Sequence, residues 1–240
     1  MADDEGIERI LVVTAHPDDV DFGAAGSVAQ WTDAGIEVVY CIATSGEAGG
    51  SDRSMSRAEM AELRRREQTA AAGVVGVSEL EFLGHPDGSV VTSLDLRRDL
   101  ARVVRRHRPQ RVLCHPPERN LARIYASHPD HVATGAATLD AVYPDARNPF
   151  AFPELLKEGL EPWTVPEVYV MTLTEGDVII DITDTIDRKI QALLCHESQI
   201  ADPAGRAELL REWAGSIARV VGLPDGHFAE AFRRVDTASA

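Results

Sequence analysis

The sequence predicts an α/β fold built on a mostly parallel sheet. Short runs rich in Val, Ile and Leu alternate along the chain with longer segments whose apolar residues recur at helical spacing. This alternation is typical of βαβ units, in which a helix connects two parallel strands. Two of the apolar runs are followed directly by clusters of His and Asp, and ligands of open α/β sheets bind at the carboxyl ends of the strands.

The first half of the chain alternates regularly between strands and helices. Residues 36–44 are rich in β-branched residues, as strands are. Residues 22–35 carry apolar positions at mostly helical spacing up to Gly35, a residue type that commonly ends helices. Ser56 with Glu59 three residues later is a capping box, which predicts a helix start. We expect strands at 8–14, 36–44, 79–83 and 111–114, and helices at 22–35, 56–73 and 94–107.

The second half is less regular. An Ala-rich helix is expected from the second His/Asp cluster to about Tyr143, followed by an irregular excursion at 144–163 that contains four prolines. Two apolar runs are expected to pair as a hairpin over Glu175-Gly176-Asp177. The expected strands are 166–173 and 177–182, and the expected helices are 184–199 and 204–221. We expect one α/β domain over residues 1–240, with a frayed tail at 236–240.

Composition excludes several classes of partner. The 39 acidic and 24 basic residues give a net charge of −15, and such a field repels phosphate backbones, so no nucleic-acid partner is expected. No apolar run approaches the ~20 residues needed to cross a bilayer, and the acidic N-terminus lacks the apolar core of a signal peptide. Three widely spaced cysteines favour reduced thiols. We therefore expect a cytoplasmic protein without membrane insertion.

The two His/Asp clusters contain the candidate metal-binding residues. The first is His16-Pro17-Asp18-Asp19 and the second is His128-Pro129-Asp130-His131, and each follows an apolar run. Taken singly, either cluster is explained by helix capping and surface polarity. Taken together, imidazoles and carboxylates at two strand ends suit a zinc-like cation. Both interpretations, a metal site and helix capping with polar surface residues, are compatible with the sequence, and the pair of clusters favours the metal site.

Catalytic zinc commonly takes three protein ligands and keeps one position for water, whose pKa falls towards ~7. One His and one Asp from the first cluster and one His from the second would supply three ligands. A carboxylate left free beside the metal can take a proton from the water. His128 and His131 lie three residues apart at a helix start, so both can face one cleft, and Asp130 between them could fix the tautomer of His128.

These residues resemble the signatures of the PIG-L/LmbE-like zinc-dependent N-deacetylases, which include N-acetylglucosaminyl deacetylases and deacetylases of the mycothiol and bacillithiol pathways. The first and second clusters match two motifs of that family, and three further segments match in the same order along the chain. The five matching segments are Ala15–Gly26, Thr44–Gly49, Arg64–Val77, His128–His131 and His196–Gln199.

The resemblance implies a Rossmann-like three-layer sandwich with the metal at the carboxyl edge of the strands. It implies that His16, Asp19 and His131 are the zinc ligands. It further implies that Asp18 is the general base that activates the metal-bound water. The implied cofactor is Zn²⁺ or another divalent transition-metal ion, because affinity alone does not select zinc.

The resemblance also assigns roles around the metal. His128 is similar to the residue that stabilises the oxyanion or protonates the leaving amine, with Asp130 holding it. Arg64 lies in a basic run that is by default a solvated helix face, but it is similar to the family's arginine that binds a sugar hydroxyl or a phosphate. Asp87 is expected to border the substrate cleft. Val20 departs from the commonest pattern, in which Glu follows the Asp pair.

The expected function is a zinc-dependent hydrolase that removes an N-acyl group, most often acetyl, from a glucosamine-containing small molecule. The first alternative is an amidase that acts on a thiol conjugate or a natural product, with the 144–163 excursion as its pocket wall. A non-catalytic sugar or nucleotide binder is disfavoured because the loop after the first strand lacks G-x-G-x-x-G. A two-metal phosphoesterase would need more ligands than two loops supply. The family resemblance also implies a homo-oligomer, a trimer or hexamer.

Other histidines have simpler interpretations. His85-Pro86-Asp87-Gly88 fits a Pro-Asp-Gly turn. His107 ends a basic helix, where positive charge favours the helix dipole. His196 is interpreted as a packed or capping residue. His115 follows a strand and could approach the site. The Gly-rich segment 45–51 is either a substrate-facing loop or a plain flexible connection.

Overall fold

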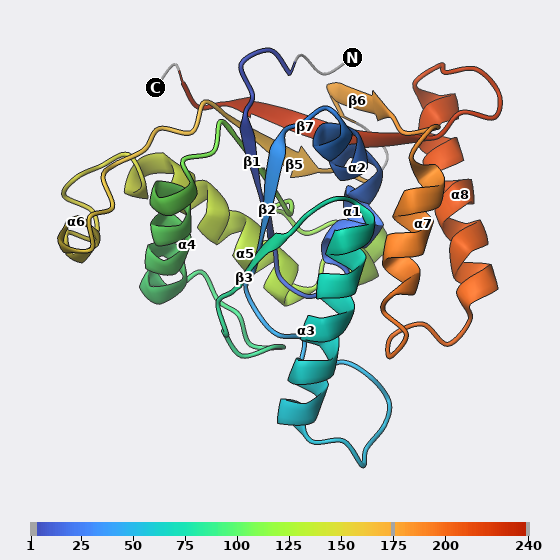
Figure 1. Cartoon of the computed structure of the whole chain (residues 1–240), viewed down its shortest axis with the longest axis horizontal. Helices are drawn as coiled ribbons and strands as arrows, with labels where there is room; N and C mark the ends of the chain where they lie inside the picture. The colour runs from blue at the N-terminus through green and yellow to red at the C-terminus, as the bar shows by residue number, and fades with distance from the viewer. Residues whose placement is uncertain (1–3, 174–175, 239–240) are drawn as a thin grey trace.

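A computed structural model describes residues 4–173 and 176–238. It contains one seven-stranded sheet in the order β3-β2-β1-β4-β5-β7-β6, with helices on both faces (Figure 1). Strands β1 to β5 pair in parallel, while β7 pairs antiparallel with β5 and β6. The predicted α/β class, with its mostly parallel sheet and three layers, is confirmed.

The strands are β1 (Arg9–Thr14), β2 (Glu37–Ile42), β3 (Glu79–Phe82), β4 (Arg111–Cys114), β5 (Glu167–Met171), β6 (Val178–Asp181) and β7 (Ala229–Asp236). The helices are α1 (Asp19–Gly23), α2 (Ala25–Asp33), α3 (Arg57–Val74), α4 (Leu94–His107), α5 (Pro129–Asp140), α6 (Glu154–Lys157), α7 (Ile186–Leu194) and α8 (Pro203–Val220). A 3₁₀ turn, η1 (Leu121–Ala126), and a π-helical turn, η2 (Ala141–Asp145), flank α5.

The core lies in two layers, one on each face of the sheet. Successive residues of β1 point to opposite faces, so Ile10 and Val12 pack against α1, α2, α3, α7 and α8, while Leu11 and Val13 pack against α4, α5 and α6 (Figure 1). Because both faces are covered, a central strand reads as a continuous apolar run, as parallel strands do. This placement leaves the carboxyl ends of β1 and its parallel neighbours together at one edge.

The expected helix over 22–35 is in fact two helices. It begins earlier, at Asp19, and breaks at Ala24, whose φ is −148°. The Glu230 carboxylate on β7 accepts hydrogen bonds from the backbone N–H groups of Gly26 and Ser27 and from the Ser27 hydroxyl. A carboxylate at this position satisfies N–H groups that a helix start leaves unpaired. The cap comes from a residue some 200 positions away, so the local pattern could not indicate the break.

The other helices of the first half begin and end close to the expected residues. The Ser56 hydroxyl accepts from the Glu59 backbone N–H, and the Ser56 backbone N–H donates to the Glu59 carboxylate, so the predicted capping box is present. α4 spans 94–107, as expected, and its Ser93 hydroxyl accepts from the Leu96 backbone N–H. These boundaries depend on local chemistry, which is why the sequence predicts them well.

The expected hairpin between 166–173 and 177–182 is wrong. β5 and β6 lie on opposite sides of β7 and each pairs with it antiparallel. The turn residue Glu175 lies outside the described residues. The sequence interpretation missed β7, which inserts between two strands that are neighbours in the chain.

The expected frayed tail does not begin at residue 236. Asp236 is the last residue of β7, and Thr237 donates hydrogen bonds from its backbone and its hydroxyl to the carbonyl oxygens of Pro166 and Val165. Residues 239–240 lie outside the described part of the chain. The pairing of β7 with β5 therefore extends order further than the sequence predicts.

The excursion at 144–163 is fixed to α4. Arg105 of α4 is 1% exposed and donates hydrogen bonds to the carbonyl oxygens of Asp145, Ala146, Asn148 and Ala151. One guanidinium thereby satisfies carbonyl groups that an irregular segment cannot pair by itself.

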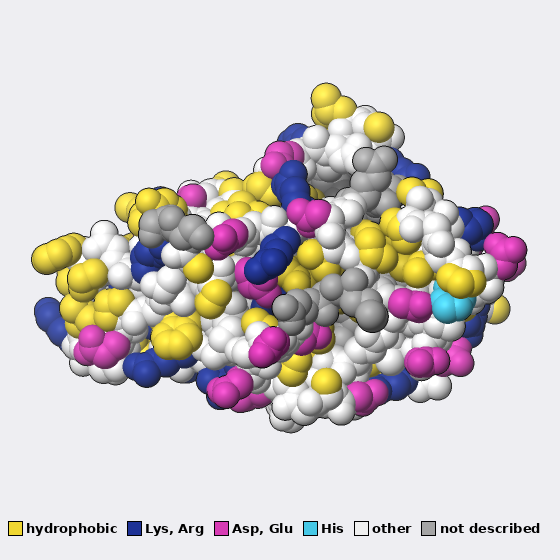
Figure 2. Space-filling model, turned by 90° about the horizontal axis from the view of Figure 1, so that it is seen from above, with side chains coloured by type: hydrophobic (Ala, Val, Ile, Leu, Met, Phe, Trp, Pro, Cys, Tyr) yellow, Lys and Arg dark blue, Asp and Glu magenta, His cyan; other side chains and the backbone are white. Residues whose placement is uncertain are grey.

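No helix within 4–173 or 176–238 combines the length and the apolar character needed to span a membrane. The face seen from above mixes Lys and Arg side chains with Asp and Glu side chains (Figure 2). Basic groups on that face lie beside acidic ones, a pattern that does not favour a phosphate backbone.

Candidate active site

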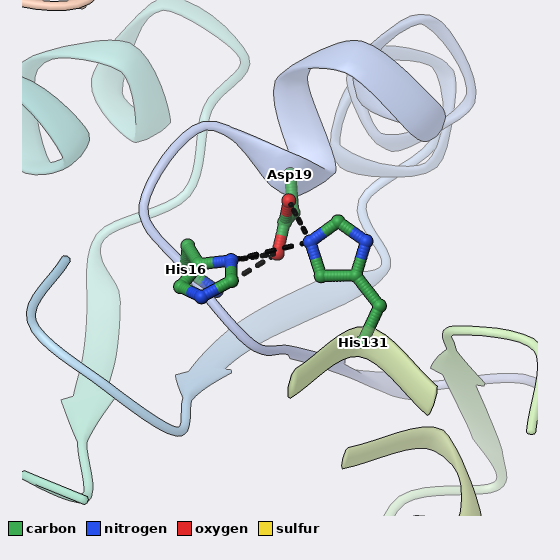
Figure 3. A group of neighbouring side chains, drawn as sticks. All are labelled: His16, Asp19 and His131. Atoms are coloured by element: carbon green, nitrogen blue, oxygen red, sulfur yellow. Dashed lines mark hydrogen bonds and ion pairs between the residues drawn. The ribbon is translucent and has the colours of Figure 1, made fainter. Parts of the chain in front are cut away.

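The two His/Asp clusters meet at the carboxyl edge of the sheet. β1 and β4 are parallel neighbours, so the loops that follow them leave the same edge. His16, Asp19 and His131 point toward one another (Figure 3). His131 Nε2 lies 3.2 Å from His16 Nδ1 and 3.0 Å from Asp19 Oδ1. The structure thus brings the three predicted ligands together, with one ligand atom of each within 4.8 Å of the others.

His115 belongs to the same cluster. It follows β4, is buried, and stacks on His131 with ring centroids 4.2 Å apart. Its Nε2 lies 3.0 Å from Asp19 Oδ2, an oxygen that also accepts a hydrogen bond from the His16 backbone N–H. Burial lowers the pKa of His115 to about 4, so the ring is neutral at physiological pH. The sequence indicated that His115 could approach the site, and it does.

Asp87 and Asp130 both contact the outer nitrogen of His16. Asp130 Oδ2 lies 3.2 Å and Asp87 Oδ1 3.1 Å from His16 Nε2. A carboxylate partner on one ring nitrogen fixes the tautomer and leaves the other nitrogen free to bind a metal. Here the free nitrogen is Nδ1, which faces Asp19 and His131. The Gly-rich loop contributes by holding Asp87, whose Oδ2 accepts from the Ala48 backbone N–H.

The expectation that Asp130 fixes the tautomer of His128 is not met. Asp130 accepts hydrogen bonds from the backbone N–H groups of Gly88 and Val90, in addition to its contact with His16. Its Oδ1 is 4.0 Å from His128 Nδ1. That nitrogen instead accepts from the Asp130 backbone N–H and caps α5, which leaves His128 Nε2 directed away from the cap. Spacing alone could not reveal that Asp130 turns toward His16.

The residues present fit a bound cation. Burial disfavours a charged imidazole, yet contacts with Asp130, Asp19 and Asp87 raise the pKa of His16 to about 12. These carboxylates therefore stabilise a positive charge at this point. Two imidazole nitrogens and a carboxylate oxygen are also the donor set of many catalytic zinc sites.

Asp18 lies beside this cluster in an unusual conformation. Its φ is 91°, in the left-handed region that non-glycine residues rarely adopt. Its backbone N–H donates to Gln68 Oε1, and its Oδ2 accepts from Arg64 Nη2 at 3.1 Å. Burial, together with the neighbouring Asp19 carboxylate, raises the pKa of Asp18 to about 6. The carboxylate is ionised at neutral pH but is more basic than an ordinary Asp.

A fully buried group lies behind Asp18. Gln68 Nε2 donates to Asp21 Oδ2, and His196 Nε2 lies 2.8 Å from the same oxygen. All three side chains are 0% exposed. His196 is packed, as expected, but the sequence analysis gave no role to Gln68 or Asp21. No local signal marks these two, because Gln68 follows the charged stretch Arg64–Glu67 of α3 and Asp21 lies in the acidic first turn of α1.

Arg64 is buried rather than solvated. Its Nη2 donates to the Pro17 carbonyl at 2.6 Å and its Nη1 to the Gly46 carbonyl at 3.1 Å, besides its contact with Asp18. The guanidinium therefore joins the loop after β1 to the loop after β2. Substrate binding by Arg64 stays a prediction.

Other histidines lie apart from this cluster. His85 Nε2 is 3.2 Å from Asp99 Oδ2, and His107 Nε2 is 2.5 Å from Glu81 Oε1. Glu79 joins His107 and Glu81 in a group of metal-binding residue types that shares no residue with the groups around His16. There, however, Arg106 already pairs with Glu81 at 2.6 Å and supplies the positive charge.

A cleft of about 1210 Å³ opens over the cluster. Asp18, Asp19, His115 and His131 line part of it. The rest is lined by α8, the segment after β4, the carboxyl end of β5, and residues of α1 and β7. No residue of 144–163 lines this cleft, so the excursion is not its wall.

Comparison with known proteins identifies relatives over nearly the whole chain. The family described as "PIG-L: GlcNAc-PI de-N-acetylase" matches residues 11–142. A diacetylchitobiose deacetylase from Thermococcus kodakarensis is 31% identical over 95% of this chain and 84% of its own length. A probable N-acetyl-α-D-glucosaminyl L-malate deacetylase from Bacillus anthracis is 27% identical over 89% of this chain and 90% of its own length.

A solved structure agrees with these matches. The N,N'-diacetylchitobiose deacetylase of Pyrococcus horikoshii, in complex with its inhibitor MPG, superimposes with a TM-score of 0.89 and 29% sequence identity. The superposition covers 98% of this chain and 86% of that protein. The family match spans both His/Asp clusters and more than half of the chain, and we conclude that this chain belongs to the PIG-L family.

Proposed function

We propose that this protein is a zinc-dependent hydrolase that removes an N-acetyl group from a small amino-sugar substrate. The observation that carries the proposal is the meeting of His16, Asp19 and His131 beside a carboxylate, Asp18, that is not needed as a ligand. Membership of the PIG-L family, and relatives named as N-acetyl amino-sugar deacetylases, support the reaction type.

In this proposal His16 Nδ1, Asp19 and His131 Nε2 would hold the cation. A zinc ion, or another divalent transition-metal ion, would supply a Lewis acid and lower the pKa of a nearby water. Asp87 and Asp130 keep a proton on His16 Nε2, so that Nδ1 offers its lone pair. His115 faces Asp19 Oδ2, which leaves Oδ1 directed at His131.

Asp18 acts as the general base. Its raised pKa lets it accept a proton from the attacking water while it is still ionised at neutral pH. The water oxygen adds to the amide carbonyl carbon, and the proton taken by Asp18 is available for the departing nitrogen. His128 is placed at the start of α5, 5.0 Å from His16 between ring centroids, where it can donate to the oxyanion or to the amine. The C–N bond breaks to give acetate and a free amine.

Several broader statements belong to the same proposal. One domain over 1–240 is supported by a single sheet whose two faces carry the large core layers. A cytoplasmic location is supported by the buried free thiols of Cys41 and Cys114. A trimer or hexamer is supported only by the family resemblance.

An amidase that acts on a larger N-acyl or thiol conjugate is the second candidate. The cleft of about 1210 Å³ exceeds the ~300–1,000 Å³ typical of small-molecule pockets. Relative kcat/KM values on N-acetyl and longer N-acyl glucosamines, and on their thiol conjugates, separate the two candidates.

Metal removal tests the proposed function. Acetate release from an N-acetylglucosamine glycoside is measured before chelation, after chelation and dialysis, and after addition of one equivalent of zinc. We expect chelation to abolish acetate release and zinc to restore it, with metal analysis near one equivalent. Undiminished release from metal-free protein would show that the proposed reaction does not depend on this site.

A further inference from the structure

The walls of the cleft outside the metal-binding cluster are rich in arginine. Five arginines line it, against two glutamates besides Asp18 and Asp19. This excess of positive charge is notable in a chain whose net charge is −15. The five arginines are Arg119, Arg123, Arg206, Arg219 and Arg233, and the two glutamates are Glu118 and Glu212.

Most of these arginines have no acidic partner in the described part of the chain. Arg233 pairs with Glu118 at 3.2 Å. Among residues 4–173 and 176–238, the guanidinium groups of the other four form no ion pair and no hydrogen bond. Elsewhere on the chain, arginines such as Arg57, Arg97 and Arg102 have carboxylate partners. The cleft therefore contains guanidinium groups whose N–H groups have no acceptor among the described residues.

Arg206 is the best placed of them. It is partly buried on α8, and its guanidinium lies 5.5 Å from the centre of the Phe22 ring. Phe22 lines the cleft three residues after Asp19, on the same short helix α1. The cation–π contact orients the guanidinium and leaves its N–H groups free. The guanidinium of Arg206 is thus held in place in the cleft near the metal-binding cluster, with its N–H groups available to donate hydrogen bonds.

α8 carries a second arginine of the cleft, Arg219, at a distance from Arg206. Arg206, Leu210, Trp213 and Arg219 all line the cleft, so one face of the helix borders it along its length. Arg206 and Arg219 are thirteen positions apart, which corresponds to about 20 Å along a helix. Between them, the apolar Leu209, Leu210 and Trp213, the polar Ser216 and the acidic Glu212 line the cleft.

Building on the proposed function, we propose that the cleft selects N-acyl amino sugars that carry an anionic group, a carboxylate or a phosphate, on the portion remote from the amide. A planar guanidinium binds either group through two parallel hydrogen bonds. The metal-binding cluster cannot supply this selectivity, because the carboxylates Asp18, Asp19, Asp87 and Asp130 surround it. Arg206 is the nearer binding residue, and Arg219 serves longer substrates.

Matched substrates test this selectivity. The zinc-loaded protein is assayed with the methyl, carboxymethyl and 1-phosphate derivatives of N-acetylglucosamine, the first neutral and the others anionic. We expect KM to be about tenfold lower for at least one anionic substrate than for the methyl glycoside, the size of one charge-assisted hydrogen bond. The advantage should shrink as salt is raised from 0.05 to 0.5 M, because salt screens exposed charges. The anionic substrate with the lower KM shows whether the cleft prefers a carboxylate or a phosphate.

The variant Arg206→Gln should bring the KM ratio of neutral to anionic substrate close to one. Arg211→Gln is the matched control, because Arg211 lies on the same helix, is exposed, does not line the cleft and pairs with Asp187. It should leave the ratio unchanged. Equal KM values for neutral and anionic substrates in the wild-type protein, or an equal change of the ratio in both variants, would overturn the proposal.

A binding measurement separates this proposal from the proposed function. If no substrate is hydrolysed, the proposed function fails, and calorimetric dissociation constants of the corresponding free amines decide the selectivity. Tighter binding of the anionic amine, lost in Arg206→Gln and kept in Arg211→Gln, supports the anion-selective cleft. Equal dissociation constants for the neutral and anionic amines overturn it.

Discussion

Asp18 adopts a left-handed backbone conformation that costs of order 1–3 kcal/mol for a non-glycine residue and persists only when its surroundings enforce it. Gln68 supplies part of that enforcement by accepting the Asp18 backbone N–H. Gln68 is in turn held by Asp21, which faces His196. The three buried residues therefore act as positioning residues for the proposed base, without contacting substrate.

His196→Asn should disturb the position of Asp18. The substitution weakens the hold on Asp21 and Gln68, so Asp18 should leave its productive position while the three metal ligands stay in place. We expect kcat to fall by about tenfold or more, because small displacements of catalytic groups are costly. KM and bound metal should change little.

His227→Asn is the control for that variant, because His227 also pairs with an aspartate, Asp181, but is only partly buried and lies outside the cleft lining. It should keep the wild-type kcat. Loss of metal in proportion to loss of activity in His196→Asn would instead indicate a general structural role.

At the scale of the element, acidic side chains join the edge strand β3 to α4, and the contacts of Glu81 are the shortest. Glu81 accepts a hydrogen bond from His107 at 2.5 Å and pairs with Arg106 at 2.6 Å. The hydrogen bond from His107, aided by Arg106, lowers the pKa of Glu81. A carboxylate whose pKa is lower in the folded state stabilises the fold above its unfolded pKa of 4.5 and loses that contribution as pH falls.

Glu81→Gln should therefore lower the free energy of unfolding at pH 7 by about 1 kcal/mol, a modest value because the group is only partly buried. The difference from wild type should shrink as pH falls from about 4.5 through the lowered pKa of the folded Glu81, because protonation then gives both chains a neutral side chain. Denaturant unfolding at pH 7 and at pH 3.5 measures it. A difference that is the same at both pH values would show that packing, and not the charge, accounts for the effect.

Elements set by local signals were predictable from sequence, and elements set by distant partners were not. The Ser56 capping box and the helix at 94–107 are present where expected. The break at Ala24 depends on Glu230, and the pairing of β6 depends on β7. Neither partner is visible in a local window, so both features escaped prediction for the same reason.

At the scale of the whole molecule, the convergence of His16, Asp19 and His131 was predictable because parallel strands place their carboxyl ends at one edge. The directions in which the side chains point were not predictable from the sequence. Asp130 turns to His16 instead of His128, because backbone N–H groups of Gly88 and Val90 hold it there. The arginine-lined wall was also hidden, since α8 borders the site only after the chain has folded.

The central claim assigns different roles to two adjacent aspartates. Asp19 is a metal ligand, and Asp18 is the general base that takes a proton from the attacking water. Comparing Asp18→Asn with Asp19→Asn, by metal content and acetate release on the same samples, tests it most directly. We predict that Asp18→Asn keeps about one equivalent of metal and loses at least about 10²-fold in kcat, whereas Asp19→Asn loses the metal as well. Full activity in Asp18→Asn, or full metal content in Asp19→Asn, would contradict it.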